Sequence, residues 1–197
     1  YYVVDKKLDV APKTFEAWIK LPSSLPIGEH ANESANDTIA RGGVIFGNYK
    51  SANEASISFE VTNKGEPKLF YIDSSTTAMT STKAVTITFS SSASKLLNDK
   101  WTHLAISLDT AVGKAKCYID GVLTETKTQS FNEYHRNFGL NRFLIGNDYR
   151  AIHNFKGAIK DVTLYSDVRT DAEILSDKNS VNLSNDGLIA NINALNK

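Results

Sequence analysis

The chain has 197 residues, of which 41% are hydrophobic and 22% are charged, and its formal net charge at pH 7 is zero. These values are typical of a globular domain large enough to bury a sizeable core. A neutral chain lacks the basic surface that binding to a phosphate backbone requires, and no apolar run approaches the ~20 residues of a membrane-spanning helix. We therefore expect a single domain, residues 1–197, with no nucleic-acid partner and no membrane insertion.

The predicted elements are mostly short strands separated by polar turns. Apolar and polar residues alternate with period two in most of them, as in strands that bury one face. One short helix is expected from Asp171 to about Asp177, because Thr170 and Glu173 form a capping-box pair before it. A slip in the alternation near Lys160-Asp161 predicts a β-bulge there. In chain order, the predicted strands span residues 2–4, 14–21, 43–46, 56–62, 68–73, 85–89, 101–108, 114–119, 122–127, 143–146, 157–165 and 187–195.

The stretch 101–124 predicts an antiparallel meander with a strict register. Its first two strands alternate cleanly, and Asp120-Gly121 is a hairpin signal because a type I′ turn needs positive φ at both central residues. Cys117 is the single cysteine, so no disulfide can form within the chain. We expect it to be a buried, unreactive core residue. The residues expected on the buried face are Thr102, Leu104, Ile106, Leu108, Ala115, Cys117 and Ile119.

Three segments resemble signatures of laminin G-like domains in the concanavalin A-like lectin/glucanase superfamily. W-x-H-L-A followed by Y-I-D-G, at 101–121, resembles the central hairpin of that family, and F-x-x-W at 15–18 resembles an early strand. Residues 155–165, followed by Asp171-Ala172-Glu173-Ile174, resemble the late signature. The segments come in family order over residues 15–175. The resemblance implies an all-β, concanavalin A-like jelly-roll sandwich of two antiparallel sheets with one short helix near the C-terminus.

Two segments of the chain, here called the echoing strands, have similar sequences. Residues 44–50 and 143–150 each contain an apolar strand, then Gly-Asn, then a tyrosine and a cation. The resemblance places both strands in one sheet, and we expect their ends to lie near each other. Aromatic rings stack on the apolar face of a sugar, while amides, carboxylates and guanidinium groups bind its hydroxyls. The candidate ligand-binding residues are Asn48, Tyr49, Asn147, Asp148, Tyr149 and Arg150, with Arg41 in a loop that could reach the same rim.

Two alternatives remain open for these aromatic residues. The Gly-Asn pairs could simply terminate strands while the tyrosines cover loops. Trp101, His103 and Tyr118 share the outward face of the central hairpin and could form an aromatic platform. We favour packing beneath a neighbouring segment for these three side chains.

The sequence gives little support for catalysis. Retaining glucanases need two carboxylates about 5 Å apart, and the superfamily's E-x-D-x-x-E pattern is absent. Glu60 has Ser58 and Thr62 as its neighbours on the same strand face. We therefore expect the protein not to be an enzyme and to require no cofactor. Relatives often carry Ca²⁺, and the resemblance makes Asp161 the candidate calcium ligand, although an ordinary residue at a bulge is an equal alternative.

These observations predict a non-catalytic, lectin-like carbohydrate-binding module. We expect an extracellular or cell-surface location and a bacterial source. The expected partners are a glycan or glycoprotein and the other domains of a larger parent chain from which this domain was excised. The alternative is a protein-interaction or spacer domain of the same fold in an adhesin or glycoside hydrolase. A remnant of a hydrolase is a third reading.

Overall fold

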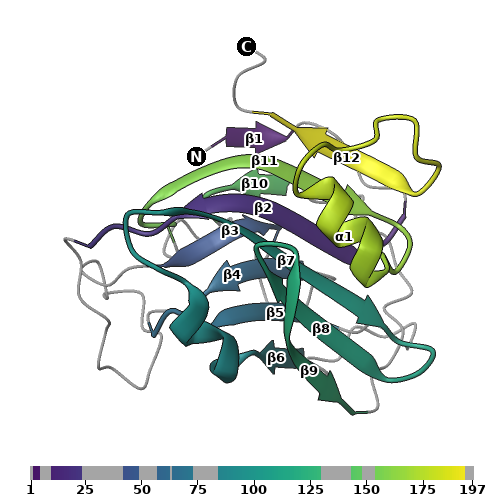
Figure 1. Cartoon of the computed structure of the whole chain (residues 1–197), viewed down its shortest axis with the longest axis horizontal. Helices are drawn as coiled ribbons and strands as arrows, with labels where there is room; N and C mark the ends of the chain where they lie inside the picture. The colour runs from purple at the N-terminus through teal and green to yellow at the C-terminus, as the bar shows by residue number, and fades with distance from the viewer. Residues whose placement is uncertain are drawn as a thin grey trace.

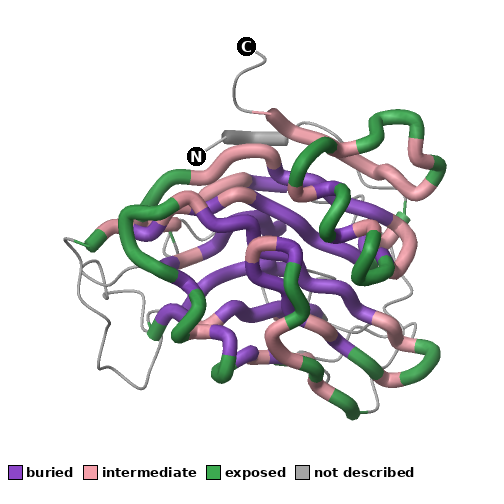
Figure 2. The backbone as a smooth tube through the Cα atoms, viewed as in Figure 1, coloured by how far each residue is buried: buried purple, intermediate pink, exposed green. Residues whose placement is uncertain are grey.

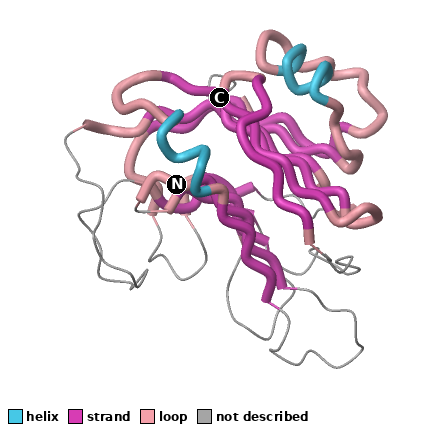
Figure 3. Tube along the Cα trace, turned by 60° about the horizontal axis from the view of Figure 1, so that its bottom comes forward, coloured by secondary structure: helices cyan, strands magenta, loops and turns pink. Residues whose placement is uncertain are grey.

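The computed structural model describes residues 2–4, 10–23, 42–48, 57–62, 64–72, 84–129, 143–147 and 154–193. Within them, twelve strands form two six-stranded sheets, and every neighbouring pair is antiparallel. The two sheets pack face to face as a sandwich (Figure 1; Figure 3). The expected all-β architecture is therefore confirmed.

The first sheet, here sheet A, begins with a short edge strand at residues that the sequence predicted to form a strand. Its strands run in the spatial order β1 (Tyr2–Val4), β10 (Phe143–Ile145), β3 (Gly43–Gly47), β4 (Ile57–Val61), β5 (Pro67–Ile72) and β6 (Ala84–Thr88).

The second sheet, here sheet B, contains the central meander. Its strands run in the order β12 (Leu188–Ile192), β11 (Ala158–Tyr165), β2 (Thr14–Lys20), β7 (Trp101–Asp109), β8 (Lys114–Ile119) and β9 (Val122–Thr128). Asp120 and Gly121 have φ values of 52° and 79°, so the predicted hairpin turn is confirmed. The predicted bulge is confirmed as well, because the β11–β2 register shifts between Lys160 and Thr163 and Asp161 has a φ of 52°.

The core lies between the two sheets and follows the alternation of the sequence. Figure 2 shows the buried backbone concentrated in the central strands of both sheets. Sheet A contributes Ile57, Phe59 and Leu69, while sheet B contributes Leu104 and Cys117, and all five are fully buried. Burial of this apolar surface is the main force that holds the layers together.

Two helical segments flank the strands. The helix α1 (Asp171–Asp177) has the predicted capping box: Glu173 N donates to Thr170 Oγ1, and Thr170 N donates to Glu173 Oε2. The 3₁₀ helix η1 (Ser90–Lys95) was not predicted. It depends on a distant contact, since Ser92 N donates to Glu125 Oε2 on β9. No helix in the described part of the chain is long and apolar enough to cross a membrane.

The outward face of sheet B is partly covered. Tyr118 packs with Ala105 and with Ile174 of α1, and its hydroxyl donates to Asp171 Oδ1 at 2.8 Å. Tyr118 and His103 are both buried, as we favoured from the sequence, so they do not form an open platform. Trp101 is only half-buried.

Candidate functional site

The outward face of sheet A carries a mixed polar and aromatic surface. Ile57, Phe59 and Val61 point into the core, so the residues between them on β4 point away from it. The strand pairings bring matching side chains of β5 and β6 beside them. We call this the sheet A outer surface and define it as Ser58, Glu60, Lys68, Phe70, Thr86 and Thr88.

An ion pair lies at the centre of the sheet A outer surface. Lys68 Nζ is 3.0 Å from Glu60 Oε1, and each side chain is only 11% exposed. Such low exposure is unusual for an ion pair on the outward face of a sheet, because removing two charges from water is costly. The pair therefore presents a carboxylate and an ammonium group in a sheltered position.

A hydroxyl and an aromatic ring stand next to this ion pair. Ser58 is the next residue along the same face of β4, and its Oγ is buried without a hydrogen-bond partner among the described residues. Phe70 pairs with Ser58 across the strands and is half-buried. An aromatic face beside a carboxylate and an ammonium can contact both the C–H face and the hydroxyl rim of a sugar.

The two echoing strands, β3 and β10, are direct neighbours in sheet A. Their pairing is antiparallel, with Leu144 opposite Gly47. Asn48 and Asn147 therefore follow opposite ends of this short ladder, roughly four residues or about 13 Å apart along the strands. We expected the two Gly-Asn ends to lie near each other, and the antiparallel register sets this spacing between them.

Asn48 has a clear structural contact. Its Oδ1 accepts a hydrogen bond from Ile57 N at 2.8 Å, and its own N donates to Ile57 O at 3.1 Å. These two bonds close the connection between β3 and β4, and the side chain is fully buried. Asn147 is also buried, at 2% exposure. A sugar-binding role for either amide stays a prediction.

Gly42, which follows Arg41, is hydrogen-bonded to the segment that follows residues 148–150. Lys156 N donates to Gly42 O at 2.6 Å, and Phe155 N donates to Gly146 O at 2.9 Å. Gly42 must be glycine there, since its φ is 101° and an added Cβ would lie 2.6 Å from Val61 O. The remaining predicted ligand residues lie outside the described residues, and their roles stay predictions: Arg41, Tyr49, Asp148, Tyr149 and Arg150.

Asp161, the candidate calcium ligand, occupies the bulge of β11 and is half-buried. In the described part of the chain, no group of three or more His, Cys, Asp and Glu side chains is arranged to hold a metal ion. Backbone carbonyls can also bind Ca²⁺, so the calcium role of Asp161 stays a prediction.

A family model described as the concanavalin A-like lectin/glucanases superfamily matches residues 2–175. The chain belongs to this superfamily. A search of curated proteins gave no match.

Several solved structures share the fold of this superfamily member. One is a Ruminococcus gnavus IT-sialidase CBM40 bound to α2,3-sialyllactose, with 17% identity, 86% of this chain and 83% of that chain covered, and a TM-score of 0.58. Another is domain 4 of AbnA, a GH43 extracellular arabinanase from Geobacillus stearothermophilus, in complex with arabinotriose. It has 22% identity and a TM-score of 0.54, and the match covers 86% of this chain and 68% of that chain. A third, a Bacteroides ovatus protein proposed to bind carbohydrate, has 14% identity and a TM-score of 0.58; the match covers 96% of this chain but 46% of that one.

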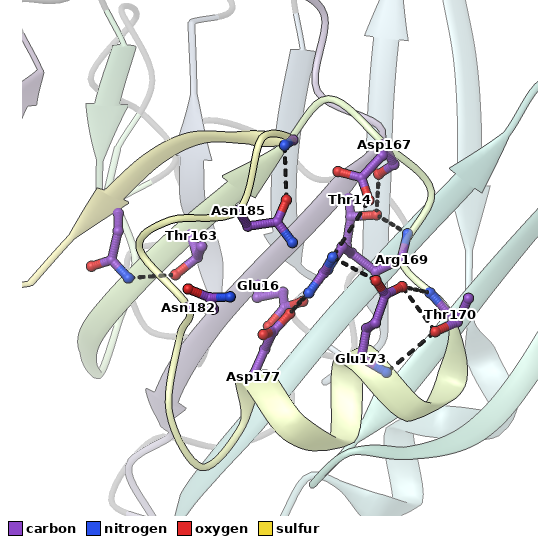
Figure 4. A network of polar contacts seen from close by, with 12 residues as sticks. Thr14, Glu16, Thr163, Asp167, Arg169, Thr170, Glu173, Asp177, Asn182 and Asn185 are labelled. Carbon is purple, nitrogen blue, oxygen red and sulfur yellow. Dashed lines mark hydrogen bonds and ion pairs between the residues drawn. The ribbon is translucent and has the colours of Figure 1, made fainter.

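On sheet B, this concanavalin A-like domain has a buried polar network that fastens α1 to the strands (Figure 4). The guanidinium of Arg169 donates to Asp177 Oδ2 through Nε and Nη2, at 3.0 and 2.8 Å, and Nη1 donates to Glu173 Oε1 at 2.9 Å. Arg169 N also donates to Thr14 Oγ1 at the start of β2. These bonds connect the chain after β11 to the helix and the sheet.

A buried acid–imidazole pair lies in the same region. Glu16 and His103 are 1% and 3% exposed, and His103 Nε2 is 3.2 Å from Glu16 Oε2. Burial raises the pKa of the Glu16 carboxyl above its ordinary value, and the hydrogen bond to His103 partly opposes this shift. Neither side chain is accessible to a polymeric substrate, so we interpret the pair as a structural contact.

Proposed function

We propose that this chain is a non-catalytic carbohydrate-binding module and that the sheet A outer surface is its binding face. The observation that carries the proposal is the sheltered Glu60–Lys68 pair next to the Phe70 ring. This combination matches the needs of a sugar better than those of a flat protein surface, because a ring and several fixed polar groups lie within one or two residues of each other.

Each group has a distinct task in the proposed complex. The ring of Phe70 stacks on the C–H face of a sugar residue. Glu60 accepts hydrogen bonds from adjacent hydroxyls, while Lys68 donates to hydroxyl or ring oxygens. At the rim, Tyr49 or Tyr149 supplies a second stacking ring. The proposed rim contacts to sugar hydroxyls come from Arg41, Asn48, Asn147, Asp148 and Arg150.

The neighbourhood of Glu60 supports binding without turnover. Its cross-strand neighbours are Val44 and Lys68, and its neighbours along the same face are Ser58 and Thr62. None of these four is the second carboxylate that a glycosidase needs about 5 Å away. Two solved structures of the same fold contain a bound glycan, α2,3-sialyllactose in one and arabinotriose in the other, which supports a glycan as the partner class. We propose an extracellular or cell-surface setting in a bacterial parent protein on the same basis.

A glycan array followed by calorimetry tests the proposal. Phe70→Leu removes the ring but keeps an apolar side chain, and Glu60→Gln removes the charge but keeps the shape. We expect each to weaken binding of the best array glycan by about tenfold to a hundredfold. The control is Thr126→Ala, an exposed position on β9 of the other sheet. Unchanged affinity in both variants, with thermal unfolding intact, refutes this face, and an array without any bound glycan leaves the protein-interaction or spacer role instead.

A further inference from the structure

Both tryptophans of the chain lie on the outward face of sheet B, together with two lysines. Lys160 of β11 is opposite Trp18 of β2, and Lys20 of β2 is opposite Trp101 of β7. Ala17 and Ile19 point into the core, so Trp18 and Lys20 point away from it. The four side chains, here the Trp–Lys patch, are each half-buried and belong to three adjacent strands.

Lys160 is held between the two indole rings. Its Nζ is 5.3 Å from the ring centroid of Trp18 and 4.9 Å from that of Trp101. Cation–π attraction to two rings fixes the ammonium in place. Lys160 is half-buried and makes no ion pair with any residue that the structure describes.

The Trp–Lys patch lies at the opposite end of sheet B from α1. That helix is fastened near Thr14, at the start of β2, whereas Trp18 and Lys20 are near the end of β2 and Trp101 begins β7. Figure 1 shows α1 over only one end of this sheet. The half-buried indoles are therefore not part of the apolar contact that Tyr118 and Ala105 make with α1.

We propose that Trp18, Trp101 and Lys160 form a second saccharide site that selects acidic sugars, an inference that rests on the proposed carbohydrate-binding function. An indole face stacks on the sugar ring, and the ammonium of Lys160 binds a carboxylate on that ring. A single fixed cation between aromatic rings suits one carboxylate. A phosphate backbone or an anionic membrane surface instead needs an extended basic field, and this chain has no net charge.

Intrinsic tryptophan fluorescence tests the second site selectively, because the only two tryptophans of the chain lie in it. The probes are α2,3-sialyllactose and trigalacturonate, with lactose as the neutral counterpart of the first. We expect the acidic probes to change the emission at concentrations at least tenfold below those of lactose, and this preference to weaken as salt increases. Lys160→Met keeps the apolar stem and should abolish the preference, and Trp18→Leu should weaken binding of both acidic probes tenfold or more.

Two controls separate this site from the sheet A outer surface. Lys116→Met removes an ammonium that already pairs with Asp171, and it should leave the acidic preference unchanged. Phe70→Leu should leave the fluorescence titration unchanged even where it weakens binding of the array glycan. The second site is refuted if no acidic probe changes the emission, or if Lys160→Met responds like the parent. A response to phosphatidylserine vesicles without a response to saccharides also overturns it.

Discussion

His103 Nε2 lies 3.2 Å from Glu16 Oε2, and both side chains are almost completely buried on the face of sheet B that points away from the core. Trp18 packs beside this pair, with its ring centroid 5.5 Å from that of His103. The outward face of the sheet thus has a dry polar region near its centre. The stability of the domain should depend on the protonation state of this region.

The first prediction concerns the pH dependence of folding. Because burial raises the pKa of Glu16 in the folded state, the unfolded chain loses this proton at lower pH than the folded protein does. Between pH 4.5, the ordinary carboxyl pKa, and the raised pKa of Glu16, the folded state binds more protons than the unfolded chain. The contribution of Glu16 to the free energy of unfolding is therefore lost as pH rises through this range. Glu16→Gln should remove this downward slope in the free energy of unfolding, measured with urea between about pH 4 and 8.

Glu173→Gln provides a control of opposite sign. The capping hydrogen bonds from the backbone and side chain of Thr170 lower the pKa of Glu173. Its contribution to stability is present above the ordinary carboxyl pKa and is lost as pH falls through the lowered value. The Gln variant should therefore lose part of the acid-induced destabilisation. If the free energy of unfolding has the same pH slope above pH 4.5 in Glu16→Gln and in the parent, burial does not raise the pKa of Glu16 as we infer.

The second prediction concerns the ion pair under α1. Arg169→Ala leaves the carboxylate of Asp177 buried and unpaired, since that side chain is only 2% exposed. Removal of one partner of a buried pair costs about 3–5 kcal/mol. We expect a loss of this size in the free energy of unfolding, measured by urea denaturation. Lys116→Ala breaks an exposed pair with Asp171 and should cost at most about 1 kcal/mol; equal losses in the two variants would contradict the network in Figure 4.

The third prediction distinguishes two roles for Asn48. Asn48→Ala leaves the buried Ile57 N–H without its acceptor, which costs about 1–3 kcal/mol. Asn179→Ala, at an exposed position after α1, should change stability by less than about 0.5 kcal/mol. Chemical denaturation measures both variants. A stability unchanged by Asn48→Ala, with weaker binding of the array glycan, would assign the amide to the ligand instead of to the β3–β4 connection.

The fourth prediction concerns the single thiol. Cys117 is fully buried, and burial raises its pKa to about 12. Since the thiolate is the reactive form, the native protein should resist a thiol reagent such as iodoacetamide at pH 8. The same protein should be labelled fully in 6 M guanidinium chloride. Mass spectrometry of the intact chain measures both states, and rapid labelling without denaturant would contradict the burial of β8.

Local patterns in the sequence were enough to determine much of the fold. Period-two alternation predicted which face of β7 and β8 points into the core between the sheets, Asp120-Gly121 predicted the hairpin, and Thr170 with Glu173 predicted α1. These features depend on neighbouring residues, so they are visible in the linear chain. The slip near Asp161 predicted a bulge for the same reason.

Only the tertiary structure decided which outward side chains are covered and which lie together. Alternation places Glu16 and His103 on the outward face, but it does not show that both side chains are almost completely buried there. The Gly-Asn echo revealed two similar strand ends, whereas the antiparallel pairing of β3 and β10 separates Asn48 from Asn147. Trp18 and Trp101 share Lys160 because three strands distant in sequence are adjacent in sheet B. Such contacts depend on strand order and register, which arise from packing across the whole domain and not from local preference.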